Sequence, residues 1–535
     1  MKTTSHEDFT KVLQRVRRNT LGDLLTRTRE RLPNKFAIAY KETRLTYREL
    51  DDLVNQTAHG FLKDGMDQGD MIAVMSKNSL DFVIVNFALA RIGAVMIPLN
   101  YMLSTQDVAY ILNHASVKGF LAAKEYAPLL DKAADKLPIQ FRYLMEYKST
   151  NPLPNTLGKW KSLAAVCAEQ PTELVEAELD DESLAHVLYT SGTESRPKGV
   201  MLTHKSLVSE YVSCIVNGEM SEDDVCIHAL PLYHSAQLHC FLGPSIYLGS
   251  SGIILDGAKP VDILETVEKE KVTQLFCPPT VWIALLRHTD FGKRDLSTLK
   301  NCYYGAAIMP MEVLKELSRR LPQARFFNFY GQTEVAPLAT VLKPEDQMRK
   351  LGSAGKPSLH VQTKIVDEHD QEVPRGVIGE IVHRTPHAML GYLYDSEKTA
   401  EAFRNGWFHS GDLGVMDEDG YITIVDRKKD MIKTGGVNVS SREVEEAIYQ
   451  LDGVSEVAVI SIPDPYWIEA VTAIIVPKEG ANLTKEQVLK FCHKNLSKFK
   501  VPKFIEFATE LPKNPSGKLL KRTLREWYKD LGSKG

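Results

Sequence analysis

The sequence has few of the features that mark secreted, membrane-spanning or nucleic-acid-binding proteins. Seven cysteines are scattered over 535 residues without any Cys-x-x-Cys pair, which excludes a small disulfide framework and indicates reduced thiols. The formal net charge of −4 is too small to indicate a nucleic-acid partner. Residues 1–19 mix charged with apolar side chains and lack the apolar core of a signal peptide. We therefore expect a cytoplasmic protein that binds no nucleic acid.

No apolar run is long and uniform enough to predict a membrane span. The most apolar segment, 82–99, carries Asn86 and Arg91 in its interior, which favours a buried helix followed by a strand. The last four residues, Gly-Ser-Lys-Gly, are not a peroxisomal Ser-Lys-Leu address. The sequence leaves open a weak association with a membrane surface and the formation of a homodimer.

The chain is too long for one hydrophobic core, so two or more domains are expected. Strand-like runs such as 71–75 and 274–276 alternate with amphipathic stretches, which predicts α/β layers with largely buried parallel strands. From residue 352 to 425, short strands with turn signals predict a β-rich subdomain. Five charged residues in succession, 426–430, predict either a solvated turn or a hinge between domains. The remainder predicts a compact α+β domain.

The segment 189–199, Tyr-Thr-Ser-Gly-Thr-Glu-Ser-Arg-Pro-Lys-Gly, carries the strongest functional signal. It follows an apolar stretch, 184–188, that is predicted to be a buried strand. Backbone N–H groups and hydroxyls in such a turn can donate to a polyphosphate, while the lysine neutralises its charge. The P-loop pattern does not fit, because Pro197 stands where its second glycine belongs and Gly199 stands where its hydroxyl residue belongs. We predict a phosphate cradle of another kind, with a plain surface turn as the alternative.

Three further blocks carry side chains suited to nucleotide chemistry. Tyr330 can stack on a base, and Glu334 can offer a hard oxygen ligand to magnesium. Asp412 lies between two glycines in a predicted tight turn, where its carboxylate can accept hydrogen bonds from ribose hydroxyls; an Asx-turn is the alternative. Lys518 follows a Pro-x-x-Pro-x-Gly frame, which predicts a rigid loop with this lysine at its tip.

In this order the blocks resemble the adenylate-forming superfamily, which comprises acyl-CoA synthetases, firefly luciferases and the adenylation domains of peptide synthetases. The resemblance also takes in residues 45–50 and 93–100, so it covers nearly the whole chain. It implies an α/β fold with a large N-terminal domain, 1–425, that binds ATP and the acyl group and contains two α/β-layered sheets and a distorted β-barrel subdomain. It also implies a hinge at 426–430 and a small, mobile α+β C-terminal domain at 431–535.

The resemblance implies a two-step reaction. A carboxylate attacks the α-phosphorus of ATP and releases pyrophosphate; then the small domain rotates, the thiol of CoA attacks the acyl-adenylate, and AMP leaves. Charge builds at the α-phosphate in the first step, so positioned cations and Mg²⁺ are expected to carry much of the catalysis. Mg²⁺ is the implied cofactor, with ATP, CoA and a small carboxylic acid as substrates.

The resemblance also implies a role for each matching residue. Lys518, Glu334 and His234 are the implied catalytic residues, and Lys429 matches the hinge position. The implied ligands of magnesium are Thr190 and Glu334. The implied ATP- and AMP-binding residues are Thr190, Ser191, Gly192, Thr193, Lys198, Gly305, Ala306, Ala307, Tyr330, Gly331, Gln332, Thr333, Asp412 and Arg427. Gly435 and Gly436 match the CoA-binding loop, where absent side chains would let the thiol approach the backbone.

The phosphate loop departs from the family pattern at two positions, where Glu194 and Ser195 replace a threonine and a glycine. Because a carboxylate beside a triphosphate is unfavourable, we expect Glu194 to point away or to meet Arg196. The same departure prompts an alternative hypothesis, in which the protein is a non-catalytic sensor that binds an adenylate.

The block 231–238 bears on the choice of acid. Amino-acid-activating relatives carry an aspartate where this chain has His234, which resembles the gate residue near the carboxylate end of the acyl tunnel in acyl-CoA synthetases. A buried histidine bonded to backbone is the alternative. Leu238 is implied to bind the acyl group, and it stands where long-chain gates often carry tryptophan, which leaves the chain length open. A fatty acid is the first expectation; an aryl or cyclic acid, or a carrier-protein acceptor, is the alternative.

Overall fold

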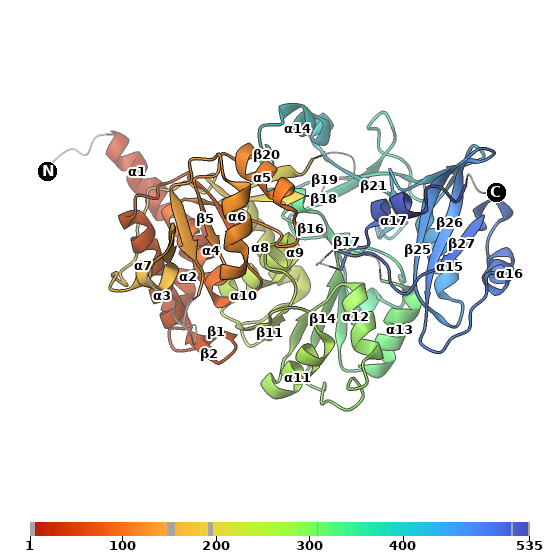
Figure 1. The fold of residues 1–535 in the computed structure, drawn as a ribbon, viewed down its shortest axis with the longest axis horizontal. Coiled ribbons are helices and arrows are strands. Elements are labelled where there is room, and N and C mark those ends of the chain that lie inside the picture. The colour runs from red at the N-terminus through yellow and green to blue at the C-terminus, as the bar shows by residue number, and fades with distance from the viewer. Residues whose placement is uncertain (1–5, 147–155, 191–195, 308, 515–516, 533–535) are drawn as a thin grey trace.

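The computed structural model describes residues 6–146, 156–190, 196–307, 309–514 and 517–532. It places a large N-terminal part at one end of the long axis of the molecule and a smaller C-terminal part at the other (Figure 1). None of the helices in these ranges is long and apolar enough to cross a membrane.

Two nine-stranded sheets form the N-terminal part. The first sheet consists, in spatial order, of β17 (Lys356–Pro357), β16 (Leu338–Leu342), β15 (Arg325–Gly331), β14 (Asn301–Gly305), β13 (Gln274–Phe276), β11 (Val225–His228), β12 (Ser251–Ile254), β1 (Phe36–Tyr40) and β2 (Thr43–Thr46). The second consists of β20 (Gly391–Tyr392), β10 (Lys198–Thr203), β9 (Leu184–Thr190), β4 (Val95–Pro98), β3 (Met71–Met75), β5 (Gly119–Ala122), β6 (Phe141–Leu144), β8 (Trp160–Ser162) and β7 (Thr156–Leu157). The central strands of both sheets are parallel, and antiparallel strands close the edges.

Helices separate and cover these two sheets. The helices of this part are α1 (His6–Arg17), α2 (Leu21–Arg31), α3 (Tyr47–Lys63), α4 (Leu80–Ile92), α5 (Thr105–His114), α6 (Ala127–Ala133), α7 (Leu163–Cys167), α8 (His204–Gly218), α9 (Ser235–Gln237), α10 (Gly243–Leu248), α11 (Pro260–Glu270), α12 (Pro279–Arg287), α13 (Met311–Arg320) and α14 (Ser396–Ala402). Side chains of α2, α3, α4 and α8 pack between the two sheets. The outer faces are covered by α11 to α13 on the first sheet and by α5 and α6 on the second. This layering confirms the predicted α/β class.

The most apolar segment of the chain forms helix α4 and strand β4, whose side chains are buried inside the protein. All side chains of α4 are buried, and the helix is followed directly by β4, as predicted. The hydroxyl of Ser79 accepts from the backbone N–H of Phe82 at its start, and Gly93 ends it in the left-handed region at φ 76°. The charge inside this helix is neutralised, because Arg91 forms an ion pair of 2.8 Å with Asp51.

The β-rich segment forms a third, antiparallel sheet of four strands. These are β18 (Gln362–Val366), β19 (Gly379–Arg384), β21 (Phe408–Met416) and β22 (Ile422–Arg427). An isolated bridge between Gly355 and Ile422 joins this sheet to the chain that follows β16.

Two local predictions in this segment are wrong. Asp412 lies within β21 rather than in a tight turn, because β21 is paired with a neighbouring strand on each side. The register of each pairing shifts once, which accommodates the glycines without ending the strand. In the charged run 426–430, residues 428–430 form a turn as expected, but Asp426 lies within β22 and is buried rather than solvated. Its carboxylate accepts hydrogen bonds from the backbone N–H and the hydroxyl of Ser441, at 2.7 and 2.8 Å, and so fixes the start of the next helix.

The C-terminal part is a compact α+β unit, as predicted. Its sheet consists of β24 (Val437–Val439), β23 (Ile432–Thr434), β26 (Ile468–Pro477), β25 (Val454–Asp464) and β27 (Phe504–Phe507). Helices α15 (Ser441–Tyr449) and α16 (Lys485–Asn495) cover one face, and α17 (Lys521–Tyr528) covers the other.

Polar contacts join the C-terminal unit to the N-terminal part. Arg442 donates to the carbonyl of Gly352 at 2.9 Å, and Arg287 donates to the carbonyl of Ser455 at 3.1 Å. These contacts hold the unit over the ends of the strands that carry the functional motifs.

Candidate active site

A cavity of about 350 Å³ lies where the two large sheets, the third sheet and the C-terminal unit meet. The residues implicated by the sequence that line it are Thr190, Lys198, His234, Gly305, Ala306, Tyr330, Gly331, Gln332, Thr333, Glu334, Arg427, Lys429 and Lys518. Ser191, Gly192 and Thr193 lie outside the described residues, as do Glu194 and Ser195. Segments more than 300 residues apart in the chain thus share one wall.

The topology explains this convergence. Strand β9 ends at Thr190, β14 ends at Gly305, and β15 ends at Gly331. Strands β14 and β15 are parallel neighbours, so their carboxyl ends open at the same edge of the sheet. Ligands of open α/β sheets bind outside these carboxyl ends.

Two residues of the predicted phosphate cradle face each other across a hairpin. Lys198 on β10 pairs in register with Thr190 on β9. The Lys198 ammonium lies 4.7 Å from the centre of the Tyr392 ring, and the Tyr392 hydroxyl donates to Glu334 Oε1 at 3.0 Å. Tyr392 therefore links the lysine and the carboxylate. Tyr392 belongs to no motif of the sequence, because it reaches the cavity through the pairing of β20 with β10, which no local pattern predicts.

Asp412 lies behind the cavity wall and organises two residues that form it. Its side chain is 5% exposed; Oδ1 pairs with Arg427 Nε at 2.7 Å, and Oδ2 accepts from the hydroxyl of Tyr330 at 2.7 Å. Burial raises the pKa of Tyr330, and the Asp412 charge adds to that effect, so the tyrosine stays a hydrogen-bond donor. The predicted base-stacking and ribose-binding residues are thus held as one group.

Lys518 reaches this cavity from the C-terminal unit. Its loop is closed by two hydrogen bonds to Asn514: the Lys518 N–H donates to Asn514 Oδ1 at 2.8 Å, and the Asn514 N–H donates to the Lys518 carbonyl at 2.9 Å. Gly517 adopts φ 80°, and its carbonyl accepts from the hydroxyl of Thr280 at 3.3 Å. Burial and the nearby Arg427 cation lower the pKa of Lys518.

His234 lies in the cavity wall and is also bonded to the backbone. Its Nδ1 accepts from the backbone N–H of Ala236 at 3.2 Å at the start of α9, and its ring also lines the cavity. Burial, with a smaller contribution from the Lys518 cation, lowers the pKa of His234 to about 4. The imidazole is therefore neutral at physiological pH.

Part of the cavity wall is aromatic. The ring centres of Phe241 and Phe276 are 4.3 Å apart with planes inclined by 16°, and Phe241 and Phe329 stack at 5.7 Å. All three line the cavity. They come from a π-helical turn and two strands, so their convergence had no signal in the sequence.

Some of the implicated residues lie away from this cavity. Leu238 does not line it: the side chain is 1% exposed and packs in the core with Leu242 and Ile246. Leu238 is an apolar side chain at the start of the π-helical turn, and its burial in this core, which includes Ile246 of α10, keeps it out of the cavity wall. Ala307 is not part of the wall either, although Gly305 and Ala306 are.

Comparison with known proteins decides the family. Residues 25–393 match the family of AMP-binding enzymes, and residues 443–518 match the C-terminal domain of AMP-binding enzymes. The chain belongs to the AMP-binding enzymes.

This AMP-binding enzyme is similar in sequence to ligases that form CoA thioesters, and similar in structure to one of them. It is 35% identical over 515 residues to a feruloyl-CoA synthase of an Amycolatopsis species, covering 96% of this chain and 100% of that protein. It is 32% identical over 533 residues to a long-chain-fatty-acid–CoA ligase of Bacillus subtilis (strain 168), covering 95% and 94%. The crystal structure of the anthranilate CoA ligase AuaEII in complex with anthranoyl-AMP is similar with a TM-score of 0.89 at 26% identity, covering 96% of this chain and 98% of that chain. These findings confirm the predicted adenylate-forming enzyme of the acyl-CoA synthetase type, an AMP-forming acid–thiol ligase.

The donor set of this AMP-binding enzyme fits magnesium. Thr190 and Glu334, the two expected ligands, line the same cavity and offer a hydroxyl and a carboxylate. Mg²⁺ prefers such oxygen ligands and is usually held by one or two protein groups together with substrate phosphates.

The two glycines expected to contact CoA lie outside this cavity. Gly435 and Gly436 form the turn between β23 and β24, with φ of 56° and 81°. A Cβ at Gly435 would lie 3.0 Å from the Trp467 ring, so glycine is required there by both conformation and contact. In this arrangement the lysine loop, not the glycine turn, faces the cavity.

Proposed function

We propose that this AMP-binding enzyme is an ATP-dependent acyl-CoA ligase that forms AMP and pyrophosphate. The observation that supports it most is the entry of Lys518, from the C-terminal unit, into the cavity that holds Thr190, Lys198 and Glu334. An ammonium group at that point can stabilise the charge that develops when a carboxylate attacks the α-phosphorus.

In the proposed first step, the nucleotide is positioned at its two ends. Arg427, which the buried Asp412 holds in place, would contact the ribose, and Tyr330 offers its ring to the adenine. Lys198 neutralises the β- and γ-phosphates, and Lys518 bridges the acid and the α-phosphate. The acid's oxygen bonds to the α-phosphorus, the bond to the bridging oxygen of pyrophosphate breaks, and pyrophosphate leaves.

Thr190 and Glu334 would hold Mg²⁺, which supplies neutralisation of phosphate charge when bound. For the second step we propose a rotation of the C-terminal unit about Lys429 that withdraws Lys518. The turn formed by Gly435 and Gly436 would then approach the cavity and admit the thiol of CoA. The thiol sulfur bonds to the acyl carbon, and AMP leaves.

A fatty acid is the first proposed substrate, in keeping with the resemblance and with the long-chain relative. An aryl acid is the second candidate, and one observation favours it: three aromatic side chains, Phe241, Phe276 and Phe329, line the cavity, and aromatic side chains can stack with or contact the edge of a planar ring. We place the reaction in the cytoplasm, since all seven cysteines are free thiols, which suits a reducing compartment.

Incubation with ATP, Mg²⁺, CoA and a panel of fatty and aryl acids tests the proposal. We expect AMP and an acyl-CoA to form in equal amounts with at least one acid. ADP as the nucleotide product would contradict the mechanism. Tight nucleotide binding without turnover on any acid would instead favour the non-catalytic sensor, and transfer only to a phosphopantetheinyl protein would favour a carrier-protein ligase.

A further inference from the structure

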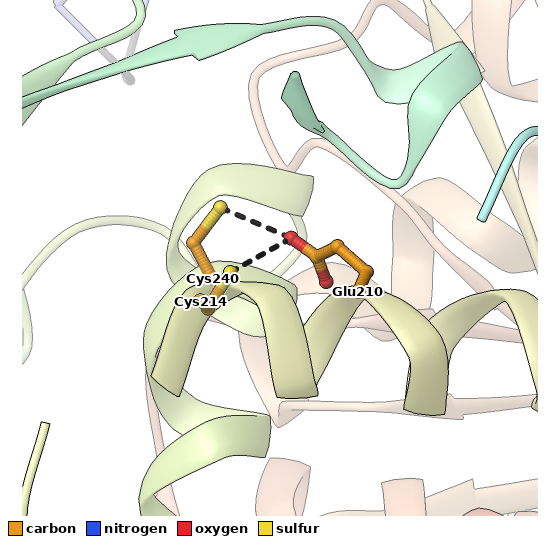
Figure 2. A group of neighbouring side chains, drawn as sticks. All are labelled: Glu210, Cys214 and Cys240. Carbon is orange, nitrogen blue, oxygen red and sulfur yellow. Dashed lines mark hydrogen bonds between the residues drawn. The ribbon is translucent and has the colours of Figure 1, made fainter. Parts of the chain in front are cut away.

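Two thiols and one carboxyl group meet beside the aromatic residues of the cavity. Glu210 and Cys214 are one helical turn apart on α8, and Cys240 comes from the π-helical turn Leu238–Leu242. Glu210 Oε1 accepts from both sulfur atoms at 3.2 Å. Figure 2 shows the two sulfurs turned toward this one oxygen.

The carboxyl group of Glu210 is unusual for its surroundings. It is fully buried, and its other oxygen, Oε2, makes no hydrogen bond within the described part of the chain. Burial raises the pKa of Glu210 to about 8 and that of Cys240 to about 12, although the backbone N–H of Leu338 favours the charged carboxylate. Buried carboxyl groups are ordinarily paired with a cation or bound to a metal. The proposed acyl-CoA ligase reaction uses none of these three groups.

The spacing of the three groups is close to that of a metal site. One ligand atom from each residue lies within 4.8 Å of the others. For zinc, with bonds of about 2.3 Å to sulfur and about 2.1 Å to oxygen, tetrahedral angles require roughly 3.6 Å between sulfur and oxygen. The observed 3.2 Å therefore needs to open by only a few tenths of an ångström.

We propose that Glu210, Cys214 and Cys240 bind one thiophilic divalent cation, of the chemistry of Zn²⁺ or Cd²⁺. Two thiolates and the carboxylate supply the donors, and the second carboxylate oxygen, Oε2, makes no hydrogen bond within the described residues that binding would have to break. Thiolate ligands select such ions over Mg²⁺, which prefers oxygen. Cys240 also lines the active-site cavity, which gives the ion a path of entry.

Binding is a proton exchange without a redox step. The cation bonds to two sulfurs and to the carboxylate, and the two thiol protons and the carboxyl proton pass to solvent. The affinity is therefore expected to rise with pH. The ion would sit beside the aromatic residues of the cavity, since Cys214 and Cys240 pack in one cluster with Phe241, Phe276 and Phe329.

Titration of the reduced protein with CdCl₂, without ATP and in excess MgCl₂, tests the site. We expect one equivalent to bind, with the ultraviolet charge-transfer absorption of cadmium–thiolate bonds. Cys214→Ala and Cys240→Ala should each abolish that absorption, and Glu210→Gln should weaken binding by at least about tenfold. Cys492→Ala, at a buried thiol of the C-terminal unit, is the matched control and should bind as the wild type does.

Crystals of the wild-type protein soaked in CdCl₂ give a second test that does not depend on the folding of a variant. An anomalous peak between the Glu210 carboxylate and the two sulfurs would support the proposal. Absence of stoichiometric binding, or a peak only at other residues, would overturn it. Neither outcome depends on turnover, so a failure of the metal-site proposal would not contradict the proposed ligase reaction, and the reverse also holds.

Discussion

Arg427 and Asp412 pair directly across two strands of the third sheet, with 2.7 Å between Nε and Oδ1. Asp412 is nearly inaccessible, whereas the Arg427 side chain is 36% exposed and lines the cavity. The pair joins the motif at residues 407–414 to the charged run at 426–430, and through Tyr330 to the motif at 328–334. One buried carboxylate therefore aligns three segments that the sequence presents separately.

Asp412→Asn is expected to raise the KM for ATP by about tenfold to 100-fold while the KM for the acid changes little. The substitution keeps the shape of the side chain but removes charge-assisted hydrogen bonds worth about 1.5–3 kcal/mol. Initial rates of pyrophosphate release measure the effect. Asp417→Asn, at a carboxylate that pairs with Lys350 outside the cavity, serves as the control. Equal increases in both KM values would show that Asp412 acts through general stability.

Lys518→Ala is expected to slow adenylation by about 100-fold to 1,000-fold, because a cation that stabilises the transition state is removed. Conversion of a supplied acyl-adenylate to the thioester should stay near the wild-type rate. Lys513→Ala is the matched control, since Lys513 lies in the same loop but pairs with Glu456 at 2.5 Å. Equal loss of both half-reactions would make Lys518 a structural residue.

Gly517→Ala is expected to reduce adenylation by about tenfold or more by displacing the lysine loop. A Cβ there would clash with Thr280 Oγ1 and come within 3.0 Å of Pro278 Cγ. Gly480→Ala separates this clash from backbone strain, because Gly480 has φ 76° and open space around it. The adenylation rates and the unfolding midpoints of the two variants show whether the loss of activity comes from the clash at Gly517 or from backbone strain. The idea fails if Gly480→Ala loses as much activity as Gly517→Ala.

The protein is expected to lose stability as the pH falls below about 6.5. Burial lowers the pKa of several histidines, His383 to about 3 and His204 to about 4, so they stay neutral when folded and bind protons when unfolded. Since the unfolded state then binds more protons, stability rises with pH and is lost as the pH falls. Each such histidine contributes roughly 1.4 kcal/mol of loss between pH 7.5 and 5.5.

Urea unfolding at pH 7.5 and 5.5 measures this difference. His383→Gln should make the pH dependence shallower by about one histidine's contribution, whatever its effect at either pH alone. His369→Gln, at an exposed histidine, should leave the dependence as it is. A wild-type protein equally stable at both pH values would contradict the expectation.

Phe276→Leu is expected to weaken the binding of aryl acids by about twofold to tenfold, since Phe276 lines the cavity and a contact between its ring and an aryl acid is worth about 0.5–1.5 kcal/mol. Straight-chain acids should be affected less, because they do not need a flat surface. KM values for a matched aryl and alkyl acid measure the change. Phe291→Leu is the control, since Phe291 is buried under α12 and α13 and does not line the cavity. Equal losses for both acids would remove the argument for an aryl substrate.

Much of the fold was predictable because its signals are local. The strands Met71–Met75 and Gln274–Phe276 occur at the predicted residues, and the apolar segment 82–99 forms the expected helix and strand. The errors arose where neighbours in space override local chemistry. The glycines beside Asp412 indicated a turn, yet pairing on both sides of β21 keeps the chain extended. Asp426 stood in a charged run, yet the N–H and hydroxyl of Ser441 compensate for its burial.

The sequence by itself determined the family, the order of the functional blocks and the residue types that could meet a nucleotide. These follow from short motifs, because a glycine turn, a hydroxyl or a lysine has the same chemistry wherever the chain places it. Only the tertiary structure decided that Lys518 enters the cavity, that Tyr392 joins Lys198 to Glu334, and that Leu238 turns into the core. Those contacts depend on strand pairing and packing between segments far apart in the chain, and no local pattern records such distances.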